Sequence, residues 1–266
     1  MDTRHPPIGV LIREWRGRRR LSQLDLALEA DISQRHLSFM ESGRAAPSRD
    51  MVLKLSERLG LPLRERNRLL LAAGFAPHFP QREADDPDLA PMMAAVDLVL
   101  KGHEPNPALA VDRHWNLIRA NAAVAPFLAG VSDPALLAPP INVLRLSLHP
   151  NGLAPRIVNL AEWRAHVLER LHRLYQATGD EGVAELADEI KTYPAPVSSR
   201  PSRAIYSDIA TTLRLRMDDG TVLSFITTIT VFGTPLDVAT SEIAIESFFP
   251  ADEATATWLA ASRPAS

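Results

Sequence analysis

The sequence predicts two domains of different fold class: an all-α N-terminal domain of five helices, followed by an α+β domain with an antiparallel sheet. Three observations support this prediction. Apolar residues recur at helical spacing through about the first 80 residues, a segment rich in proline and acid follows, and the last third alternates as strands do. We place the first domain at residues 1–80, a linker with a connecting helix at 81–105, and the second domain at 106–266.

The N-terminal helices are predicted from capping residues and apolar stripes. Ser22 and Ser33 each precede a short helix, and a serine hydroxyl can accept a hydrogen bond from an unpaired amide in the first turn. Leu24, Leu26, Ala27 and Leu28 form the expected apolar face of the first of these helices, and Leu37 and Met40 that of the second. The three other helices are expected at Ile8–Arg18, after the cap Ser48, and at Leu63–Ala73, with Leu69, Leu70 and Leu71 facing the bundle.

The outward face of the second short helix carries polar residues in its first turn. Gln34 and Arg35 stand there, and these two side-chain types can form paired hydrogen bonds with base edges in the major groove of DNA. The pattern is typical of a helix that reads DNA.

Residues 13–60 resemble the helix-turn-helix domain of the Cro/xenobiotic-response-element family of regulators. The resemblance is carried by Arg16, Leu21, Ser22, Gln23, Leu26, Ala27, Ser33, Leu37, Glu41, Gly43, Pro47 and Ser48. The sequence departs from the family at Asp31, because glycine usually holds this turn position. Aspartate enters the left-handed conformation less readily than glycine but better than most residues.

This resemblance implies a set of DNA contacts and a homodimer on an operator. Gln34 and Arg35 are expected to contact bases, and Phe39 a thymine methyl group or sugar. Phosphate contacts are expected from Gln23, Ser33, Gly43 and Arg44, while His36 and Ser38 could serve either purpose. A two-fold dimer places two such helices about 34 Å apart, one turn of DNA.

The charge distribution agrees with a DNA-binding N-terminal half, although the whole chain carries a net charge of −3. Residues 1–80 hold 14 basic and 9 acidic residues, a balance of +5, and the remainder holds 15 against 23, a balance of −8. Positive charge on the DNA-binding side is what phosphate neutralisation requires. The cluster Arg16, Arg18, Arg19 and Arg20 either contacts phosphates or is a solvated helix end that favours the helix dipole.

The composition narrows the class of protein further. The chain contains no cysteine, which excludes thiol catalysis, disulfides and cysteine-ligated zinc. No apolar run reaches the roughly 18 residues that a membrane span needs, and the start has no apolar signal-peptide core. We therefore expect a cytoplasmic protein that does not interact with membranes.

The elements of the second domain are predicted from periodicity. A short helix with Met92 or Met93, Val96 and Leu100 either packs on its own domain or connects and dimerises the chain. Strands are expected at residues 109–112, 116–120, 209–217, 221–232 and 243–249, and helices at 122–129 (capped by Asn121), 142–148, 157–177, 181–191 and 252–261. We expect an antiparallel sheet with helices on one face.

Residues 106–261 resemble the MmyB-like ligand-binding domain found attached to helix-turn-helix regulators, a PAS-like fold. Three runs carry the resemblance: VDRHWNLIRANAA at 111–123, LRLSLHPNGLAPRIVNLAEW at 144–163 and FGTPLDVATSEIAIESFFPADEATA at 232–256. The resemblance implies a pocket for a small apolar ligand, such as a fatty acid.

Candidate pocket residues follow from this expected architecture. The apolar candidates are Trp115, Leu144, Leu148, Trp163, Val167, Phe225, Ile229 and Phe232, and ordinary core packing is the alternative for each. His149, Arg156 and Asn159 could pair with a ligand carboxylate, arginine with two hydrogen bonds, or could instead cap helices and fix loops.

No motif indicates an enzyme, a metal site or a cofactor. His166 and His172 lie on different sides of their predicted helix, and no HExxH, GxSxG or phosphate-binding glycine loop occurs. The sequence therefore predicts a ligand-responsive DNA-binding regulator. The alternative is a DNA-binding regulator whose C-terminal domain serves only dimerisation or protein contacts.

Overall fold

The computed structural model describes residues 6–82, 86–194, 211–233, 235 and 237–262. Contacts divide the chain into two units. The first consists of Met1–Ala84 with Gln176–Thr178 and Thr234–Ser241, and the second of Asp85–Tyr175, Gly179–Gly233 and Glu242–Ser266. Each unit is described by itself below.

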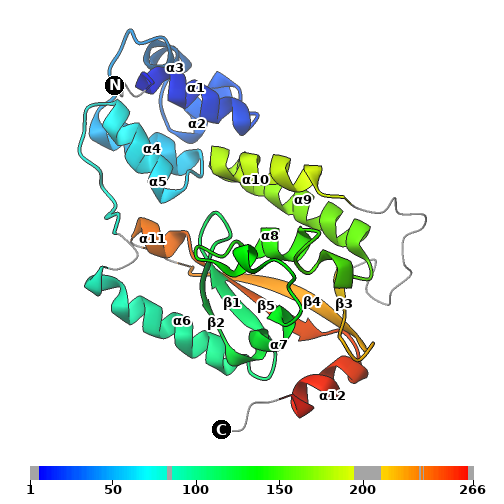
Figure 1. Ribbon diagram of the computed structural model, residues 1–266. Coiled ribbons are helices and arrows are strands. Elements are labelled where there is room, and N and C mark those ends of the chain that lie inside the picture. Colours follow the sequence, from blue (N-terminus) through cyan, green and yellow to red (C-terminus); the bar gives the residue numbers. More distant parts are fainter. Residues whose placement is uncertain (1–5, 83–85, 195–210, 234, 236, 263–266) are drawn as a thin grey trace. The chain divides into compact units, whose positions relative to one another are not determined.

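The N-terminal unit contains the five predicted helices (Figure 1). They are α1 (Ile8–Arg18), α2 (Gln23–Glu29), α3 (Gln34–Glu41), α4 (Arg49–Arg58) and α5 (Leu63–Ala72). The hydroxyls of Ser22, Ser33 and Ser48 accept hydrogen bonds from the amides of Asp25, His36 and Met51. The capping predictions are therefore confirmed, and Asp25 also accepts from the Ser22 amide to complete a capping box.

Three leucines that were expected to face the core of this unit point outward instead. Leu24 and Leu28 are 50% and 70% exposed, and Leu71 is 43% exposed. Since residues four apart share a helix face, Leu24 and Leu28 lie together on the side opposite Leu26 and Ala27, which are buried. The prediction was wrong because one helix face cannot hold four residues that span more than half a turn.

The crossing of α1 and α3 depends on a glycine. A Cβ atom at Gly9 would lie 2.4 Å from the carbonyl oxygen of Met40. No side chain can be accommodated at that distance, so Gly9 allows the two helices to approach closely. Leu11, Ile12 and Trp15, elsewhere on α1, are buried in the core that Leu37 and Met40 share.

The second unit combines helices with strands. Its strands are β1 (Ala108–Val111), β2 (Leu117–Ala120), β3 (Thr212–Arg216), β4 (Val222–Val231) and β5 (Ala244–Pro250). Its helices are α6 (Ala90–Gly102), α7 (Ala125–Leu128), α8 (Val143–Leu148), α9 (Leu160–Thr178), whose last residues are grouped with the first unit, α10 (Glu181–Thr192) and α12 (Glu253–Ala261). The short α11 (Val238–Ser241) follows β4 and belongs to the first unit.

The five strands form one antiparallel sheet in the order β2-β1-β5-β4-β3. The predicted α+β class is confirmed. The turn at Asp219 and Gly220 joins β3 to β4, and Gly220 has a φ of +85°, which glycine adopts without strain. Residues 209 and 210 of the strand predicted from Ile209 lie outside the described residues.

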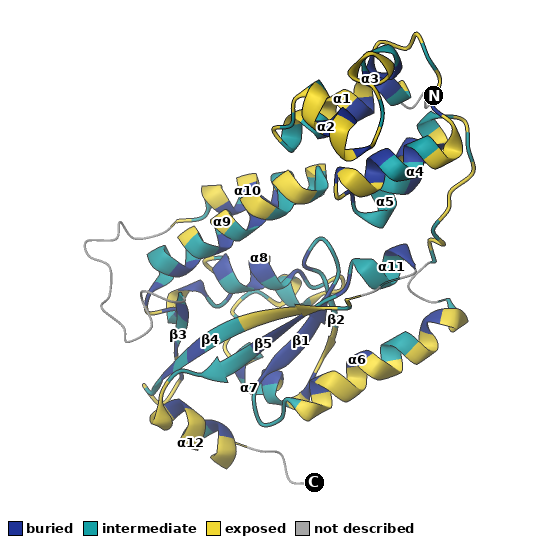
Figure 2. Cartoon of the chain, turned by 180° about the vertical axis from the view of Figure 1, so that it is seen from behind, coloured by how far each residue is buried: buried dark blue, intermediate teal, exposed yellow. Residues whose placement is uncertain are grey.

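Helices cover both faces of this sheet, whereas one covered face was expected. All four residues of β1 are buried. Ala108 and Ala110 share a core with Val96 and Leu100 of α6, and the alternate residues of β1 pack with α8, α9 and α10 on the other side. Figures 1 and 2 show α6 on one face and α8, α9 and α10 on the other. Of the two roles open to the helix at 92–100, packing on its own domain is therefore the one observed.

Asn121 occupies the predicted position before a helix but has a different role. Its side chain makes no capping bond to the short 3-10 turn at Ala122–Val124. Its amide nitrogen donates to the carbonyl oxygens of Leu100 and Asn106, and its Oδ1 accepts from the Ala108 amide. Asn121 thus ties the end of α6 to the start of β1.

The long helix α9 begins at Leu160, three residues after the predicted start. Ile157 forms an isolated β-bridge with Leu215 of β3, which holds it in extended conformation. Gly179, with a φ of +65°, ends the helix in the left-handed conformation that glycine favours. None of the helices among the described residues combines the length and apolar character that crossing a membrane requires.

Candidate functional site

The first turn of α3 presents polar side chains that are not used by the fold. Gln34, Arg35 and His36 are exposed, and within the described part of the chain none of their side chains has a hydrogen-bond partner. Leu37 and Met40, on the opposite side of the helix, are fully buried. The helix therefore has one face anchored in the core and one face available for base edges.

Phe39 holds two arginines on this surface. The guanidinium of Arg35 lies 5.2 Å from the centroid of the Phe39 ring, and that of Arg44 lies 4.4 Å from it. Such cation–π contacts are worth about 0.5–1 kcal/mol at an exposed site. Gly43, with a φ of +74°, ends α3 and directs the chain toward Arg44. Phe39 thus pre-positions both cations, a role that the sequence did not reveal.

Glu41 is the centre of a buried polar cluster behind this surface. Arg16 donates from Nε to Oε1 at 2.6 Å and from Nη2 to Oε2 at 3.0 Å, and Gln23 donates from Nε2 to Oε2 at 2.8 Å. Burial raises the pKa of Glu41, but the hydrogen bonds from Arg16 and Gln23 outweigh burial, so the pKa lies below its usual range. One amide hydrogen of Gln23 is thus used inside the domain, and the other is left for the predicted phosphate contact.

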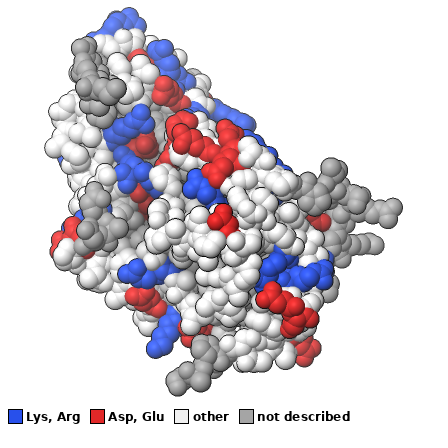
Figure 3. Space-filling view, in the orientation of Figure 1, with Lys and Arg blue, Asp and Glu red and all other residues white. Residues whose placement is uncertain are grey.

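The four clustered arginines do not share one environment. Arg16 is held by Glu41, and Arg19 donates from Nε to the Leu59 carbonyl and from Nη2 to the Gly60 carbonyl at the end of α4. Arg18 stacks near Trp15, and Arg20 is exposed. Arg16 and Arg19 therefore bind groups inside the domain. The two predicted roles, phosphate contact and a solvated helix end, did not include such internal contacts. Figure 3 shows Lys and Arg side chains over the N-terminal helices on the face in view.

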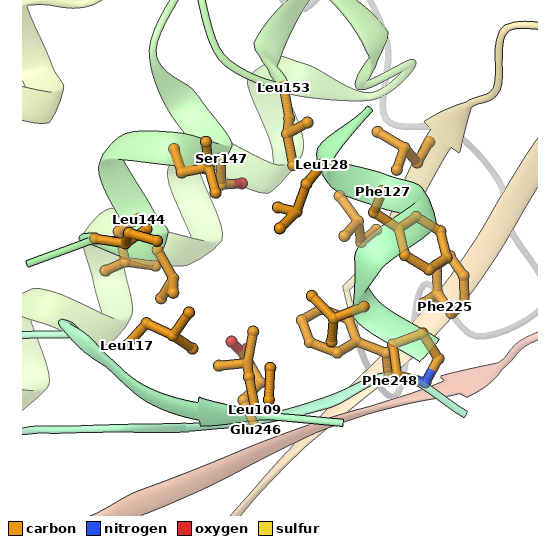
Figure 4. A pocket seen from close by; sticks show the side chains of 18 of the residues that line it. Leu109, Leu117, Phe127, Leu128, Leu144, Ser147, Leu153, Phe225, Glu246 and Phe248 are labelled. Carbon is orange, nitrogen blue, oxygen red and sulfur yellow. The ribbon is translucent and has the colours of Figure 1, made fainter. Parts of the chain in front are cut away.

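The second unit contains a cavity of about 240 Å³ between the sheet and its covering elements. Figure 4 shows leucine and phenylalanine side chains around it. The lining residues are Pro107, Leu109, Leu117, Ala120, Asn121, Val124, Ala125, Phe127, Leu128, Ile141, Val143, Leu144, Leu146, Ser147, Leu153, Trp163, Leu213, Leu215, Phe225, Glu246 and Phe248. The walls are almost entirely apolar, as in sites for apolar ligands.

Three polar side chains interrupt the apolar lining. Asn121 makes three hydrogen bonds to the backbone, which use both of its N–H donors. Ser147 of α8 accepts a hydrogen bond from the indole Nε1 of Trp163 at 3.1 Å. Glu246 of β5 is only 3% exposed, and its oxygen points from the floor into the cavity in Figure 4.

A half-buried arginine behind the wall forms an ion pair with Glu246. Nη1 of Arg170, on α9, lies 2.8 Å from Oε1 of Glu246, and its guanidinium lies 5.1 Å from the Trp115 ring centroid and 5.9 Å from that of Trp163. Burial raises the pKa of Glu246, and the Arg170 guanidinium opposes this rise. Nη2 of Arg170 is 3.0 Å from Nε2 of His166, whose pKa is lowered by burial and by the nearby guanidinium.

Comparison with known families settles the class of protein. Residues 12–66 match the helix-turn-helix family, and residues 92–261, well over half of the chain, match the family described as MmyB-like transcription regulator ligand binding domain. The chain belongs to this family. It is a DNA-binding transcription regulator with an MmyB-like ligand-binding domain. The predicted recognition and fold class are confirmed, and both matched families consist of regulators and not enzymes.

Neither the curated proteins nor the solved structures provide a close relative of this chain. No curated protein matches the sequence significantly. A solved structure described as "Structure of an RNA-binding Light-Oxygen-Voltage Receptor" is similar with 14% identity and a TM-score of 0.29, over 96% of this chain and 64% of that chain. The chain thus spans less than two thirds of that structure. Among the described residues of the MmyB-like regulator, no group of three or more His, Asp or Glu is arranged to hold a metal ion.

The eight apolar residues predicted for the pocket lie in four different environments. Leu144, Trp163 and Phe225 line the cavity. Trp115, Leu148 and Val167 are buried in the surrounding core, Ile229 is 42% exposed on β4, and Phe232 packs against the core on the α6 side. Whether any of these side chains contacts a ligand stays a prediction.

His149, Arg156 and Asn159 do not line the cavity and bind the chain's own atoms. His149 accepts from the Asn151 amide. Arg156 donates to the carbonyl oxygens of Phe127, Ala129 and Arg216. Asn159 donates to the Thr212 carbonyl at 2.7 Å and accepts from the Arg214 amide at 3.0 Å, so it continues the edge of β3. These contacts agree with the alternative prediction, in which the three side chains fix loops and do not bind a ligand.

Sequence reasoning missed both cavity-facing polar groups, Ser147 and Glu246. A signal for Glu246 was present, because it is the one acidic residue in the apolar run at 243–249. Period-two alternation places it on the same face of β5 as Phe248 and Ala244, which pack on the main core. An acid on the buried face of a strand is rare enough to mark a site.

Proposed function

We propose that this regulator is a homodimer whose MmyB-like domain binds a small apolar molecule in the cavity, and whose α3 helices read an operator. The single observation that carries the ligand part is the cavity of about 240 Å³ with apolar walls. Apolar cavities of about 150 Å³ already accommodate benzene. The cavity therefore has room for a larger apolar ligand, including the hydrocarbon part of a fatty-acid-like molecule.

The proposed DNA contacts use the surface of α3 and its flanks. Gln34 and Arg35 contact bases, and Arg44 at the end of α3 contacts phosphate. A single helix of eight residues reads only a few base pairs, which is why we propose a two-fold dimer on a palindromic site. The dimer and the expected cytoplasmic location stay predictions.

A cavity-filling variant tests the ligand proposal in the full-length protein. Leu117 lines the cavity from β2, and Leu117→Phe adds volume to that wall. The matched control is Leu98→Phe on α6, where the side chain is 73% exposed. Thermal unfolding is measured with and without toluene, a neutral apolar probe.

We expect toluene to raise the midpoint of unfolding of the wild type and of Leu98→Phe, with a rise that grows with the logarithm of its concentration once the site is mostly filled, as linkage requires. The rise should be at least halved in Leu117→Phe. If toluene stabilises none of the three proteins, the cavity does not bind apolar molecules. The alternative, a C-terminal domain that serves only dimerisation or protein contacts, would then be favoured.

A further inference from the structure

The floor of the cavity is formed by an ionisable group in an otherwise apolar surface. Glu246 lies on β5 opposite Leu109 of β1, and it lines the cavity while being only 3% exposed. Placing a carboxyl group here costs free energy unless each oxygen finds a partner. The position therefore needs an explanation beyond packing.

Only one oxygen of Glu246 is satisfied by the fold. Oε1 accepts from Nη1 of Arg170 at 2.8 Å, and within the described residues Oε2 has no hydrogen-bond partner. Arg170 does not line the cavity, because its guanidinium lies beside the rings of Trp115 and Trp163. The carboxyl group thus separates the cation from the cavity and presents its second oxygen to whatever the cavity holds.

A second polar group faces Glu246 across the cavity. The oxygen of Ser147 accepts from the Trp163 indole, and its hydroxyl hydrogen has no acceptor among the described residues. Figure 4 shows the Ser147 oxygen directed into the space between the two walls. The cavity therefore offers one weak donor and one strong acceptor to a ligand.

The charge of the lining disfavours a carboxylate ligand. None of the residues described around the cavity is Lys, Arg or His, the side chains that pair with carboxylates. A ligand carboxylate would also lie in the same small cavity as the carboxyl group of Glu246, and like charges repel strongly where water is scarce. A ligand ammonium group is disfavoured for a different reason, because it would approach the positively charged guanidinium of Arg170.

A neutral hydroxyl fits both possible protonation states of Glu246. It donates to the carboxylate, and it accepts from the carboxylic acid. We infer that the ligand of this cavity is a neutral apolar molecule whose hydroxyl group hydrogen-bonds to Glu246, and that it is not a fatty-acid carboxylate. This inference rests on the proposed function of the cavity and specifies the polar end of its ligand.

Three probes of one chain length test the inference on the full-length wild-type protein. Octan-1-ol, octanoate and octylamine are titrated by calorimetry at one pH and salt concentration, with toluene as the reference for apolar binding. We expect octan-1-ol to bind at least ten times more tightly than either charged probe. Octanoate binding as tightly as octan-1-ol, with toluene binding intact, would overturn the inference and leave the proposed function standing. Absence of binding by all four probes would overturn the proposed function.

A substitution then assigns the preference to Glu246. Glu246→Gln keeps the shape of the side chain and removes its negative charge, and the preference for octan-1-ol over octanoate should fall to less than threefold. Glu253→Gln, the same change at an exposed position of α12, should leave the preference unchanged. If folded Glu246→Gln still prefers octan-1-ol over octanoate as strongly as the wild type does, Glu246 is not the source of the preference. If that variant does not fold, the wild-type probe series still decides.

Discussion

The guanidinium of Arg16 holds the carboxylate of Glu41 with two hydrogen bonds, at 2.6 Å and 3.0 Å, across 25 residues of the chain. The Glu41 side chain has no exposed surface, and that of Arg16 is 16% exposed. The pair joins the end of α1 to the end of α3, the helix that presents Gln34 and Arg35. The ion pair therefore helps to fix the orientation of α3, the helix proposed to read DNA.

Removal of the Glu41 charge should destabilise the N-terminal unit. Glu41→Gln leaves Arg16 partly buried without its counter-charge, and breaking such a pair costs about 3 kcal/mol. We expect faster hydrogen exchange of the α1 and α3 amides and a lower unfolding temperature. The control is Glu57→Gln, the same change at an exposed position of α4, which should behave like the wild type.

The same pair predicts a dependence of stability on pH. The pKa of Glu41 lies below its ordinary value of 4.5 in the folded protein, so the folded state binds the proton less tightly than the unfolded state does. The contribution of the ionised Glu41 to the free energy of unfolding is complete at pH values above that ordinary pKa. It is lost as the pH falls toward and through the pKa of the folded state. Calorimetry between pH 7 and pH 3 should therefore show a smaller loss of stability in Glu41→Gln than in the wild type. Parallel losses would show that Glu41 does not contribute to acid sensitivity.

Two glycines in one helix should respond oppositely to alanine. At Gly9 a Cβ atom would meet the Met40 carbonyl oxygen at 2.4 Å, whereas at Gly17 nothing lies within 4 Å. Gly9→Ala should destabilise the N-terminal unit by about 2 kcal/mol through overpacking. Gly17→Ala should stabilise it by roughly 0.5–1 kcal/mol, since alanine is the better helix former. Denaturant unfolding measures the change in stability of both variants. Equal changes would mean that α1 can move away from α3 and accommodate the added methyl group at position 9.

The turn before α3 should tolerate glycine better than aspartate. Asp31 has a φ of +52°, and its side chain is 98% exposed. The left-handed conformation costs an L-residue roughly 1–2 kcal/mol, part of which glycine recovers. We expect Asp31→Gly to be neutral or stabilising by up to about 1 kcal/mol. Asp50→Gly, in the first turn of α4, should destabilise instead, and thermal unfolding of both variants compares them.

Arg35 should carry sequence preference on the operator. If Arg35 bonds to a guanine, Arg35→Ala should lose roughly 1–3 kcal/mol of binding free energy on the operator and much less on unrelated DNA. The protein's own promoter region provides the test DNA, and footprinting with titrations at several salt concentrations provides the measurement. Arg58→Ala removes an exposed arginine from α4 and should retain the preference. An unchanged footprint and affinity in Arg35→Ala would remove Arg35 from the set of base-reading residues.

Most elements of the fold could be predicted because their signals are local. Ser22, Ser33 and Ser48 cap helices through contacts within three residues, and Asp219 and Gly220 form a turn within four. The errors arose where periodicity alone was used to decide which side chains of a helix face the core. Leu24 and Leu28 were expected inside because leucine usually is, and they are exposed because Leu26 and Ala27 already occupy the core face.

The candidate sites show the same division between local and distant information. The outward residues of α3 could be identified because a short helix with Leu37 and Met40 inside has only one other face. The cavity could not, because its walls come from all five strands and from α7, α8 and α9, which meet only after the sheet has formed. Accordingly three of the eight predicted apolar residues, Leu144, Trp163 and Phe225, line it.

The sequence by itself determined the serine caps of the N-terminal helices, the approximate ranges of most strands and helices, and the concentration of positive charge in the first 80 residues, since each depends on neighbours along the chain. Only the tertiary structure decided that Arg16 and Arg19 are held inside their domain and that Arg170 lies behind Glu246. The reason is that a charged side chain acquires its role from partners that lie 25, 40 or 76 residues away. Periodicity carries no information about which of those distant residues will meet.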